Sequence, residues 1–264
     1  MRRNLPFFLS LNLSKTILSQ WSVIDRLLVH GDKGLEVSET ISLAMKEGRK
    51  TLLETEAKAV CEKYGIPITQ FKFAKNETDA LRSAKEIGFP VVLKIVSTDI
   101  IHKSDVGGVV VDVKNAKEVR NAYRQILDNV KKHNPGAKIT GMLIQEMAPK
   151  GTEVIVGAIK DPQFGPAIMF GLGGIFVEVL KDVTFRVAPV TEDEAAEMIQ
   201  EVKAYPLLKG YRNTPPSDLK AITEILVNTS RLMMDHLEIK ELDLNPIMVY
   251  EKGAKTVDAR IILE

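Results

Sequence analysis

The order of the expected strands and helices is the feature that most constrains the fold of this chain. Most β-rich stretches come in neighbouring pairs, and a single helical stretch separates one pair from the next. A doubly wound parallel sheet requires strict alternation of strand and helix, which this order lacks. We therefore predict an α+β protein with mixed or antiparallel sheets, arranged in two lobes.

The expected elements can be placed from periodicity and from turn residues. Helices are expected over residues 42–64, 77–87, 116–133, 192–202 and 218–236. Strands are expected over residues 68–73, in two runs within 91–113, and over 139–147, 153–160, 167–170, 175–180, 239–250 and 256–262. Asn76 and Ser217 are the expected N-caps of two helices, and Thr191 and Glu194 have capping-box spacing.

Composition narrows the class of protein. The 264 residues allow one large or two small domains, and a formal net charge of +1 provides no basic field for nucleic acid. No apolar run approaches the roughly 20 residues that a membrane span needs. The single Cys61 excludes an internal disulfide framework. We expect a soluble cytoplasmic protein without nucleic-acid or membrane partners, in which residues 1–40 form an atypical N-terminal extension.

Residues 91–113 are expected to form a strand, a polar loop, a glycine pair and a second strand, which is an order that suits phosphate. Lys94 lies in the first strand, where a buried ammonium needs an anionic partner, although a strand-end lysine can also reach solvent. Gly107 and Gly108 allow close backbone approach, and their N–H groups could cradle an anion. His102 and Lys103 lie in the polar loop between the first strand and the glycine pair. A lone histidine is usually structural or solvated, but a neutral imidazole can also accept a phosphoryl group.

Two acidic residues flank the turn at Pro149-Lys150-Gly151. Glu146 ends one expected strand, just before Met147, and Glu153 opens the next. Backbone at such a hinge can bind an adenine edge, and a carboxylate can bind ribose hydroxyls. The alternative is a solvated hairpin that carries two surface acids. The GLGG run at 171–174 matches neither the dinucleotide nor the Walker pattern and supports only a close backbone approach.

The ELDLNP run at 241–246 is the second concentration of polar residues. Glu241, Asp243 and Asn245 alternate with leucines, so their side chains should share one face of a strand. Asp258 in the last strand could lie beside them. Carboxylate and amide oxygens are the ligands that Mg²⁺ prefers, which favours a metal site over a half-solvated edge strand.

These motifs together resemble the ATP-grasp family, in which two α+β lobes hold ATP between them. The resemblance is to the β subunit of ADP-forming acetate–CoA ligases, which are related to succinyl-CoA synthetase, and it spans roughly residues 43–263. It rests on LKIVSTDIIHKSDVGGV, the QEM hinge, GTEVIVGAIKDPQFGPAIMFGLGGIFVEVLKDVTFRVAPV, and ELDLNPIMV with VDARI.

The resemblance implies a domain division, an activity and a set of partners. Residues 43–145 would hold the N-terminal helix and the smaller lobe, and residues 146–264 the larger lobe. The family converts acyl-CoA, phosphate and ADP reversibly to the free acid, CoA and ATP, with bound ATP or ADP and Mg²⁺. An α subunit would carry the CoA site and the first phosphohistidine, in an α₂β₂ assembly.

The resemblance also implies roles for individual residues. His102 would relay the phosphoryl group, and Asp243 would support it. Asn245 and Asp258 would bind the metal. The nucleotide would be bound by Lys94, Lys103, Gly107, Gly108, Glu146, Met147 and Glu153. Two alternatives remain open: a stand-alone ATP-grasp carboxylate ligase, and a nucleotide-binding regulatory subunit without chemistry.

Overall fold

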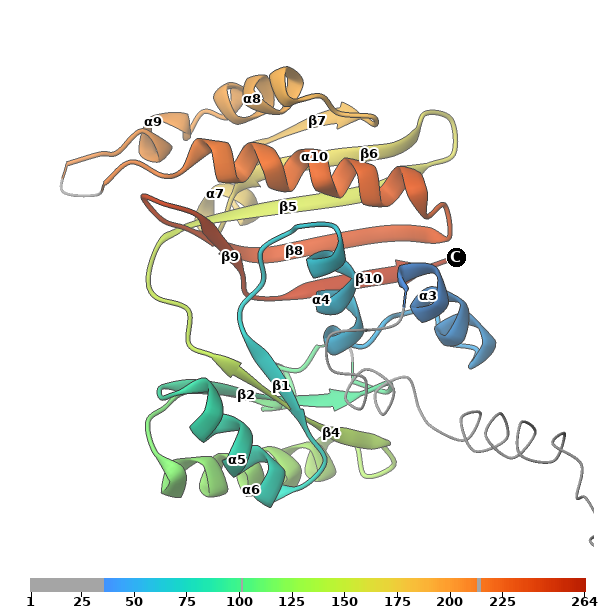
Figure 1. Cartoon of the computed structure of the whole chain (residues 1–264), viewed down its shortest axis with the longest axis vertical. Coiled ribbons are helices and arrows are strands. Elements are labelled where there is room, and N and C mark those ends of the chain that lie inside the picture. The colour runs from blue at the N-terminus through green and yellow to red at the C-terminus, as the bar shows by residue number, and fades with distance from the viewer. Residues whose placement is uncertain (1–35, 101, 213–214) are drawn as a thin grey trace, which may run out of the picture.

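A computed structural model describes residues 36–100, 102–212 and 215–264, which form two antiparallel sheets with helices (Figure 1). The smaller sheet has the order β1-β4-β2-β3. Its strands are β1 (Phe71–Ala74), β2 (Val91–Ser97), β3 (Val109–Val113) and β4 (Ile139–Glu146). The helices α5 (Glu77–Ile87) and α6 (Ala116–His133) pack on it. Every pairing between these strands is antiparallel, as expected for the α+β class.

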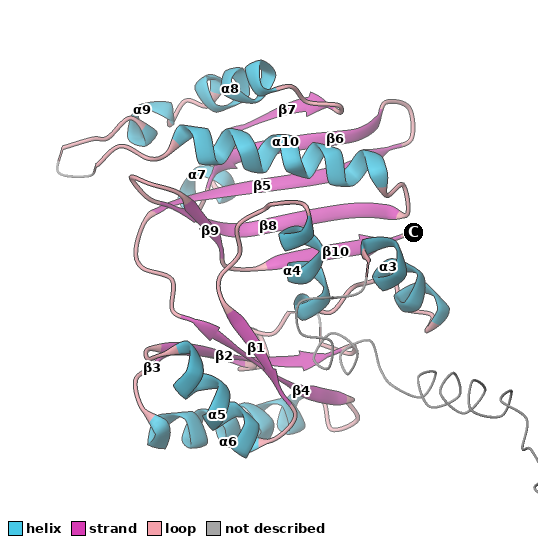
Figure 2. Ribbon diagram, in the orientation of Figure 1, coloured by secondary structure: helices cyan, strands magenta, loops and turns pink. Residues whose placement is uncertain are grey.

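The larger sheet has six strands in the order β10-β8-β5-β6-β7, with β9 paired to β8. Its strands are β5 (Thr152–Asp161), β6 (Gly165–Leu172), β7 (Val183–Val187), β8 (Ile239–Val249), β9 (Ala254–Thr256) and β10 (Ala259–Leu263). Helices α8 (Glu192–Glu201) and α10 (Leu219–Asp235) cross the face that Figure 2 turns to the viewer. The short helices α7 (Ile175–Glu178) and α9 (Tyr205–Leu208) lie at one end.

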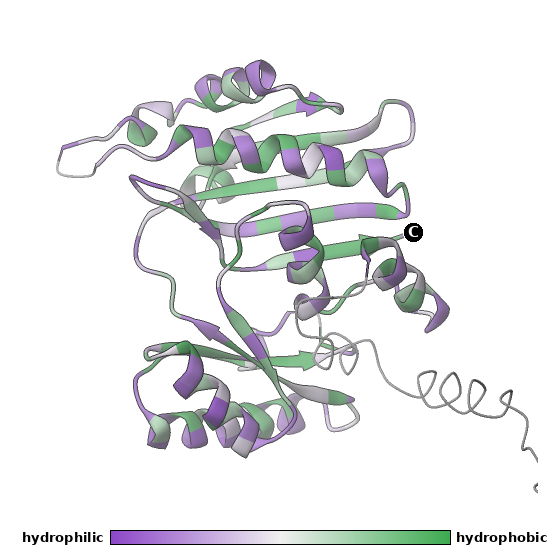
Figure 3. Ribbon diagram, viewed as in Figure 1, coloured by the Kyte–Doolittle hydropathy of each residue, from purple (hydrophilic) through white to green (hydrophobic). Residues whose placement is uncertain are grey.

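Each sheet has its own hydrophobic core, built by the periodicity of its elements. In β8, Leu242 and Leu244 are buried in the larger core, whereas Glu241 and Asp243 occupy the opposite face. Figure 3 shows α10 alternating hydrophobic and hydrophilic colour around its turns, as an amphipathic helix should. Among the residues described, none of the helices is long and apolar enough to cross a membrane.

Several expected helices are confirmed where the sequence carries its own end signals. Asn76 accepts a hydrogen bond from the backbone N–H of Asp79 at the start of α5. Thr191 and Glu194 form the expected capping box of α8. The cap of α10 is one residue later than expected: Asp218, and not Ser217, accepts from the N–H of Ala221. Both residues can cap a helix, so the sequence alone did not separate them.

The expected helix over 42–64 is wrong, because two helices occupy this region. They are α3 (Val37–Lys46) and α4 (Glu54–Lys63), and both contribute to the larger core. The first helix therefore packs with the larger sheet rather than the smaller one. Residues 37–40, which we had placed in the N-terminal extension, belong to α3. The rest of that extension, up to residue 35, lies outside the described residues.

The strands over 139–147 and 153–160 are confirmed as β4 and β5, but their expected pairing is wrong, and so is the strand expected over 175–180. Residues 139–147 and 153–160 do not form a hairpin, because β4 pairs with β1 and β2, whereas β5 pairs with β6 and β8. The turn between them is the connection from one sheet to the other. Residues 175–180 contain the short helix α7 instead of a strand. Apolar runs of this length fit a strand or a short helix equally well, and tertiary contacts decide between them.

Candidate active site

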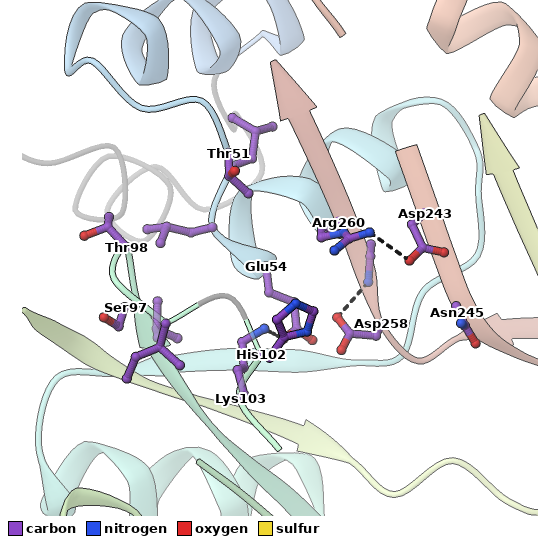
Figure 4. A pocket seen from close by; sticks show the side chains of 15 residues that line it. Thr51, Glu54, Ser97, Thr98, His102, Lys103, Asp243, Asn245, Asp258 and Arg260 are labelled. Carbon is purple, nitrogen blue, oxygen red and sulfur yellow. Dashed lines mark hydrogen bonds and ion pairs between the residues drawn. The ribbon is translucent and has the colours of Figure 1, made fainter. Parts of the chain in front are cut away.

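A cavity between the two sheets brings together residues that are far apart in the sequence (Figure 4). His102 and Lys103 line it from the loop after β2, and Asp243 and Asn245 line it from β8. Asp258 lines it from the segment before β10. All the residues expected to carry catalysis or bind the metal therefore face one cavity. Met248, near the end of β8, and Tyr250, just after it, do not line the cavity.

Lys94 lies behind this cavity in a buried ion-pair cluster. Its Nζ lies 2.6 Å from Oε1 of Glu54 and 3.4 Å from Oδ2 of Asp258, and it donates to the carbonyl of Val257 at 3.2 Å. The expected anionic partner of Lys94 is therefore supplied by α4. Burial by itself would lower the pKa of Lys94, but attraction to Glu54 and Asp258 outweighs burial and raises that pKa.

Glu54 is the centre of this cluster. Its carboxylate also lies 3.0 Å from Nζ of Lys103 and 3.6 Å from Nζ of Lys58. Burial would raise the pKa of Glu54, but attraction to Lys94, Lys103 and Lys58 lowers it to about 2. Burial lowers the pKa of Lys58 to about 8, against the opposing attraction to Glu54. Two carboxylates, Glu54 and Asp258, thus face three ammonium groups, which leaves a surplus of positive charge beside the cavity.

Asp243 pairs with a second cation in the cavity. Oδ2 of Asp243 lies 3.5 Å from the guanidinium of Arg260, which also donates to Glu241 at 2.9 Å. Burial raises the pKa of Asp243, and the Arg260 guanidinium opposes that rise. His102 is exposed, and no described residue hydrogen-bonds to its ring. Asp243 and His102 therefore line the same cavity without a hydrogen bond between them.

The glycine pair does not provide the anion cradle that we expected. The N–H of Gly108 donates to the carbonyl of Lys103 at 2.7 Å, and the N–H of Gly107 donates to Ser104 at 3.1 Å. Gly107 has a φ of +62°, and a Cβ on Gly108 would lie 2.7 Å from Cγ2 of Ile95. Both glycines are thus required by the tight loop that presents His102, and their N–H groups are already used.

The hinge residues lie outside the cavity lining. Glu146 accepts hydrogen bonds from Lys255 at 2.8 and 2.7 Å and from the N–H of Gln70 at 2.7 Å. Met147 is 39% exposed just after β4, and Glu153 is exposed near the start of β5. These three residues surround the connection between the sheets, which is the hinge position that the sequence indicated. The carboxylate of Glu146 is already paired with Lys255.

Comparison with known proteins identifies the family. A family model described as an ATP-grasp domain matches residues 43–263. The chain belongs to the ATP-grasp family. It is 53% identical over 232 residues to "Acetate–CoA ligase [ADP-forming] I subunit beta" of Pyrococcus furiosus, a match that covers 88% of this chain and 100% of that relative. The expected fold and the resemblance to these β subunits are confirmed.

Solved structures agree with this assignment to the ATP-grasp family. The dinucleotide-forming acetyl-coenzyme A synthetase 1 of Ca. Korarchaeum cryptofilum, in complex with coenzyme A, Ca-AMPCP and HgCl⁺, matches with a TM-score of 0.85 and 53% identity, covering 87% of this chain and 100% of that chain. A second structure of that enzyme contains coenzyme A and Mg-AMPPCP, with a phosphohistidine segment pointing towards the nucleotide binding site. It matches with a TM-score of 0.77 and 50% identity over 87% of this chain and 100% of that chain.

The donor set of this ATP-grasp site fits a magnesium ion. The N–H of Asn245 donates to the carbonyl of Asp258 at 3.3 Å, and both side chains line the cavity. Mg²⁺ typically takes one or two carboxylates and completes its shell with phosphate and water oxygens. In the part of the chain that the structure describes, no three His, Cys, Asp or Glu residues are grouped to enclose a metal.

Sequence reasoning missed two charged residues of this site. Glu54 was hidden inside an expected helix that continued past it, and only its i,i+4 spacing to Lys58 marked it as part of a charged pair. Arg260 lies in an apolar strand. Its alternation with Ala259 and Ile261 indicated that its side chain points to the polar face, where Asp243 also lies, but not that the two side chains form a contact. Thr51, Ser97 and Thr98 complete the polar wall of the cavity.

Proposed function

We propose that this chain is the nucleotide-binding β subunit of an ADP-forming acyl-CoA synthetase. The enzyme converts acyl-CoA, phosphate and ADP reversibly to the free acid, CoA and ATP. The observation that carries the proposal is the single cavity that His102, Lys103, Asp243, Asn245 and Asp258 line from both sheets. The similarity to acetate–CoA ligase β subunits along nearly the whole described chain supports the same activity.

The surplus positive charge beside the cavity suits the phosphates of ADP and ATP. Lys94 and Lys103 neutralise phosphate oxygens, and Glu54 holds both ammonium groups in place before nucleotide binds. Asn245 and Asp258 hold Mg²⁺, which supplies further neutralisation of phosphate charge when bound. Phosphoryl transfer depends mainly on such positioning and charge neutralisation.

The hinge between the sheets is the proposed place for the rest of the nucleotide. Backbone beside Met147 binds the adenine edge, and Glu153, whose carboxylate is exposed, accepts from the ribose hydroxyls. Glu146 has a positioning role in this proposal, because its ion pair with Lys255 ties β4 to β9 across the hinge.

His102 is the proposed relay between the partner subunit and ADP. A neutral ring nitrogen of His102 attacks the phosphorus of the partner's phosphohistidine, so that one P–N bond breaks as another forms. An oxygen of the β-phosphate of ADP then attacks the same phosphorus, the bond to His102 breaks, and ATP forms. Asp243 supports His102 by accepting a hydrogen bond from the N–H of its second ring nitrogen once the two side chains come together in the cavity.

The remaining chemistry belongs to an α subunit, which carries the CoA site and the first phosphohistidine. The name "subunit beta" of the Pyrococcus furiosus relative agrees with such a partner. We also propose an α₂β₂ assembly, which can be tested by measuring the mass of the complex by sedimentation.

The test follows phosphate from labelled ATP onto His102 in the presence of the α subunit. We expect His102→Ala to lower ATP formation by at least about 10³-fold while nucleotide affinity is unchanged, because the nucleophile is lost but the phosphate site remains. His133→Ala is the matched control, since His133 is an exposed histidine at the end of α6.

Other outcomes would replace this proposal. Full activity of His102→Ala would remove the relay. Ligation of an acid to CoA by the purified chain alone would favour a stand-alone carboxylate ligase. Nucleotide binding without any phosphorylation of His102 would favour a regulatory subunit.

A further inference from the structure

The face of the larger sheet opposite α8 and α10 carries a row of residues that leads to the cavity. Phe185 in β7 pairs with Met169 in β6, Met169 pairs with Gly157 in β5, and Gly157 pairs with Asp243 in β8. Residues paired across neighbouring strands point to the same face. Because Asp243 lines the cavity, the side chains of Phe185 and Met169 stand on the face that opens to it.

On this face, the central residues of β5, β6 and β7 are apolar, whereas those of β8, next to the cavity, are charged. We call Ile159, Met169, Phe185 and Val187 the apolar patch. Phe185 is 54% exposed, Ile159 50% and Val187 49%. Glu241 and Asp243, with their partner Arg260, border the patch on the side of the cavity. Clustered exposed apolar side chains with a polar rim are typical of protein interaction sites.

Gly157 makes a groove between the apolar patch and Asp243. It lies in the middle of β5, where a glycine weakens a strand unless something approaches the backbone. A Cβ at this position would lie 3.1 Å from Cε of Met169. The groove is lined by Gly157, Met169 and Phe185 on one side and by Glu241 and Asp243 on the other. It therefore joins the apolar patch to the wall of the cavity.

We infer that the apolar patch and this groove seat the segment of the α subunit that presents its phosphohistidine. The inference rests on the proposed function, since that function requires a histidine of another chain to reach His102. Asp243 lines both the groove and the cavity, so a segment lying in the groove ends beside the relay histidine. The opposite face of the sheet is closed to such a segment, because α8 and α10 pack on it.

The chemistry of the occupant follows from the groove. Apolar side chains of the segment pack on Phe185 and Ile159, and an extended backbone crosses the groove at Gly157, over which the side chain of Met169 lies. The phosphohistidine comes next along the segment and reaches the cavity, whose lysines attract its negative charge. A second copy of this chain would also use the apolar patch, but the proposed relay takes its phosphoryl group from a histidine of the α subunit and not from another copy of this chain.

The test uses the complete chain with the α subunit of the same organism. Phe185→Glu and Ile159→Glu each place a charge in the apolar patch at a half-exposed position, so folding should survive. We expect each to weaken α-subunit association, measured by sedimentation, by about 30-fold or more, as for a central interface residue. Phe164→Glu is the matched control, because Phe164 is 67% exposed in the turn between β5 and β6 and does not line the groove.

Nucleotide binding by the isolated chain separates this inference from the proposed function. AMPPCP with Mg²⁺ should bind wild type and both variants equally. If wild type binds neither nucleotide nor α subunit, the proposed function fails. If wild type binds both, and Phe185→Glu and Ile159→Glu change neither association nor phosphoryl transfer, the groove is not the docking site and the proposed function stands.

Hydrogen exchange gives an independent measurement on the wild-type proteins. Adding the α subunit should slow exchange in residues 183–187 and 157–159. Protection confined to other elements would overturn the inference. So would a self-associated form of this chain that Phe185→Glu dissociates while α-subunit binding is unchanged.

Discussion

Replacing Glu54 by Gln tests the charge cluster behind the cavity. The substitution keeps the shape of the side chain but removes the charge that serves Lys94, Lys103 and Lys58 at 2.6, 3.0 and 3.6 Å. The Glu54 side chain is only 1% exposed, and that of Lys58 is fully buried. Removing one partner of a buried ion pair costs about 3–5 kcal/mol, because the remaining charge stays desolvated. We expect a loss of this size in the free energy of unfolding.

The assay is chemical denaturation, combined with nucleotide titration. Glu54→Gln should lose both stability and nucleotide affinity, since Lys94 and Lys103 are no longer held at the cavity. Glu56→Gln is the control on the same helix: Glu56 is buried and hydrogen-bonded to Arg49 at 2.7 and 3.0 Å, away from the cavity. It should lose stability but keep its nucleotide affinity.

A double-mutant cycle with Lys58→Met measures the coupling within the cluster. Lys58 has the least exposed side chain of the three lysines, so removing it should relieve part of the surplus charge that Glu54→Gln leaves. The double variant should therefore be less destabilised than the sum of the two single variants, by about 0.5–3 kcal/mol. Additive losses, or a Glu54→Gln variant within about 1 kcal/mol of wild type, would refute the account of this cluster.

Further predictions concern pH, the metal and a helix end. The pKa of Glu54 is lowered from 4.5 to about 2, so the stability advantage of wild type over Glu54→Gln should be complete above pH 4.5 and shrink as pH falls towards 2, as measured by denaturation at each pH. Asp258→Ala should lower Mg²⁺-dependent nucleotide affinity, measured by calorimetry with and without Mg²⁺, and an unchanged affinity would remove Asp258 from the metal site. Thr191→Ala should cost about 1 kcal/mol of unfolding free energy through loss of the capping box, and leave nucleotide affinity unchanged.

Much of the site could be predicted because it depends on local pattern. The alternation of Glu241, Asp243 and Asn245 with leucines placed their side chains on one face, as the structure confirms. That this face lines the same cavity as the His102 loop could be inferred only from the family resemblance. The buried partner of Lys94 could not be predicted at all, because Glu54 lies 40 residues away and belongs to a helix that packs with the other sheet.

The sequence by itself determined the helices with their own caps and the faces of the strands. These features depend on side chains a few residues apart, so α5, α6 and α8 could be located to within a residue or two. The tertiary structure alone decided which strands pair. It separated β4 from β5 into different sheets and used the N–H groups of Gly107 and Gly108 inside a turn. Strand pairing and hydrogen-bond partners are non-local, so the residues that decide them carry no mark in the local pattern.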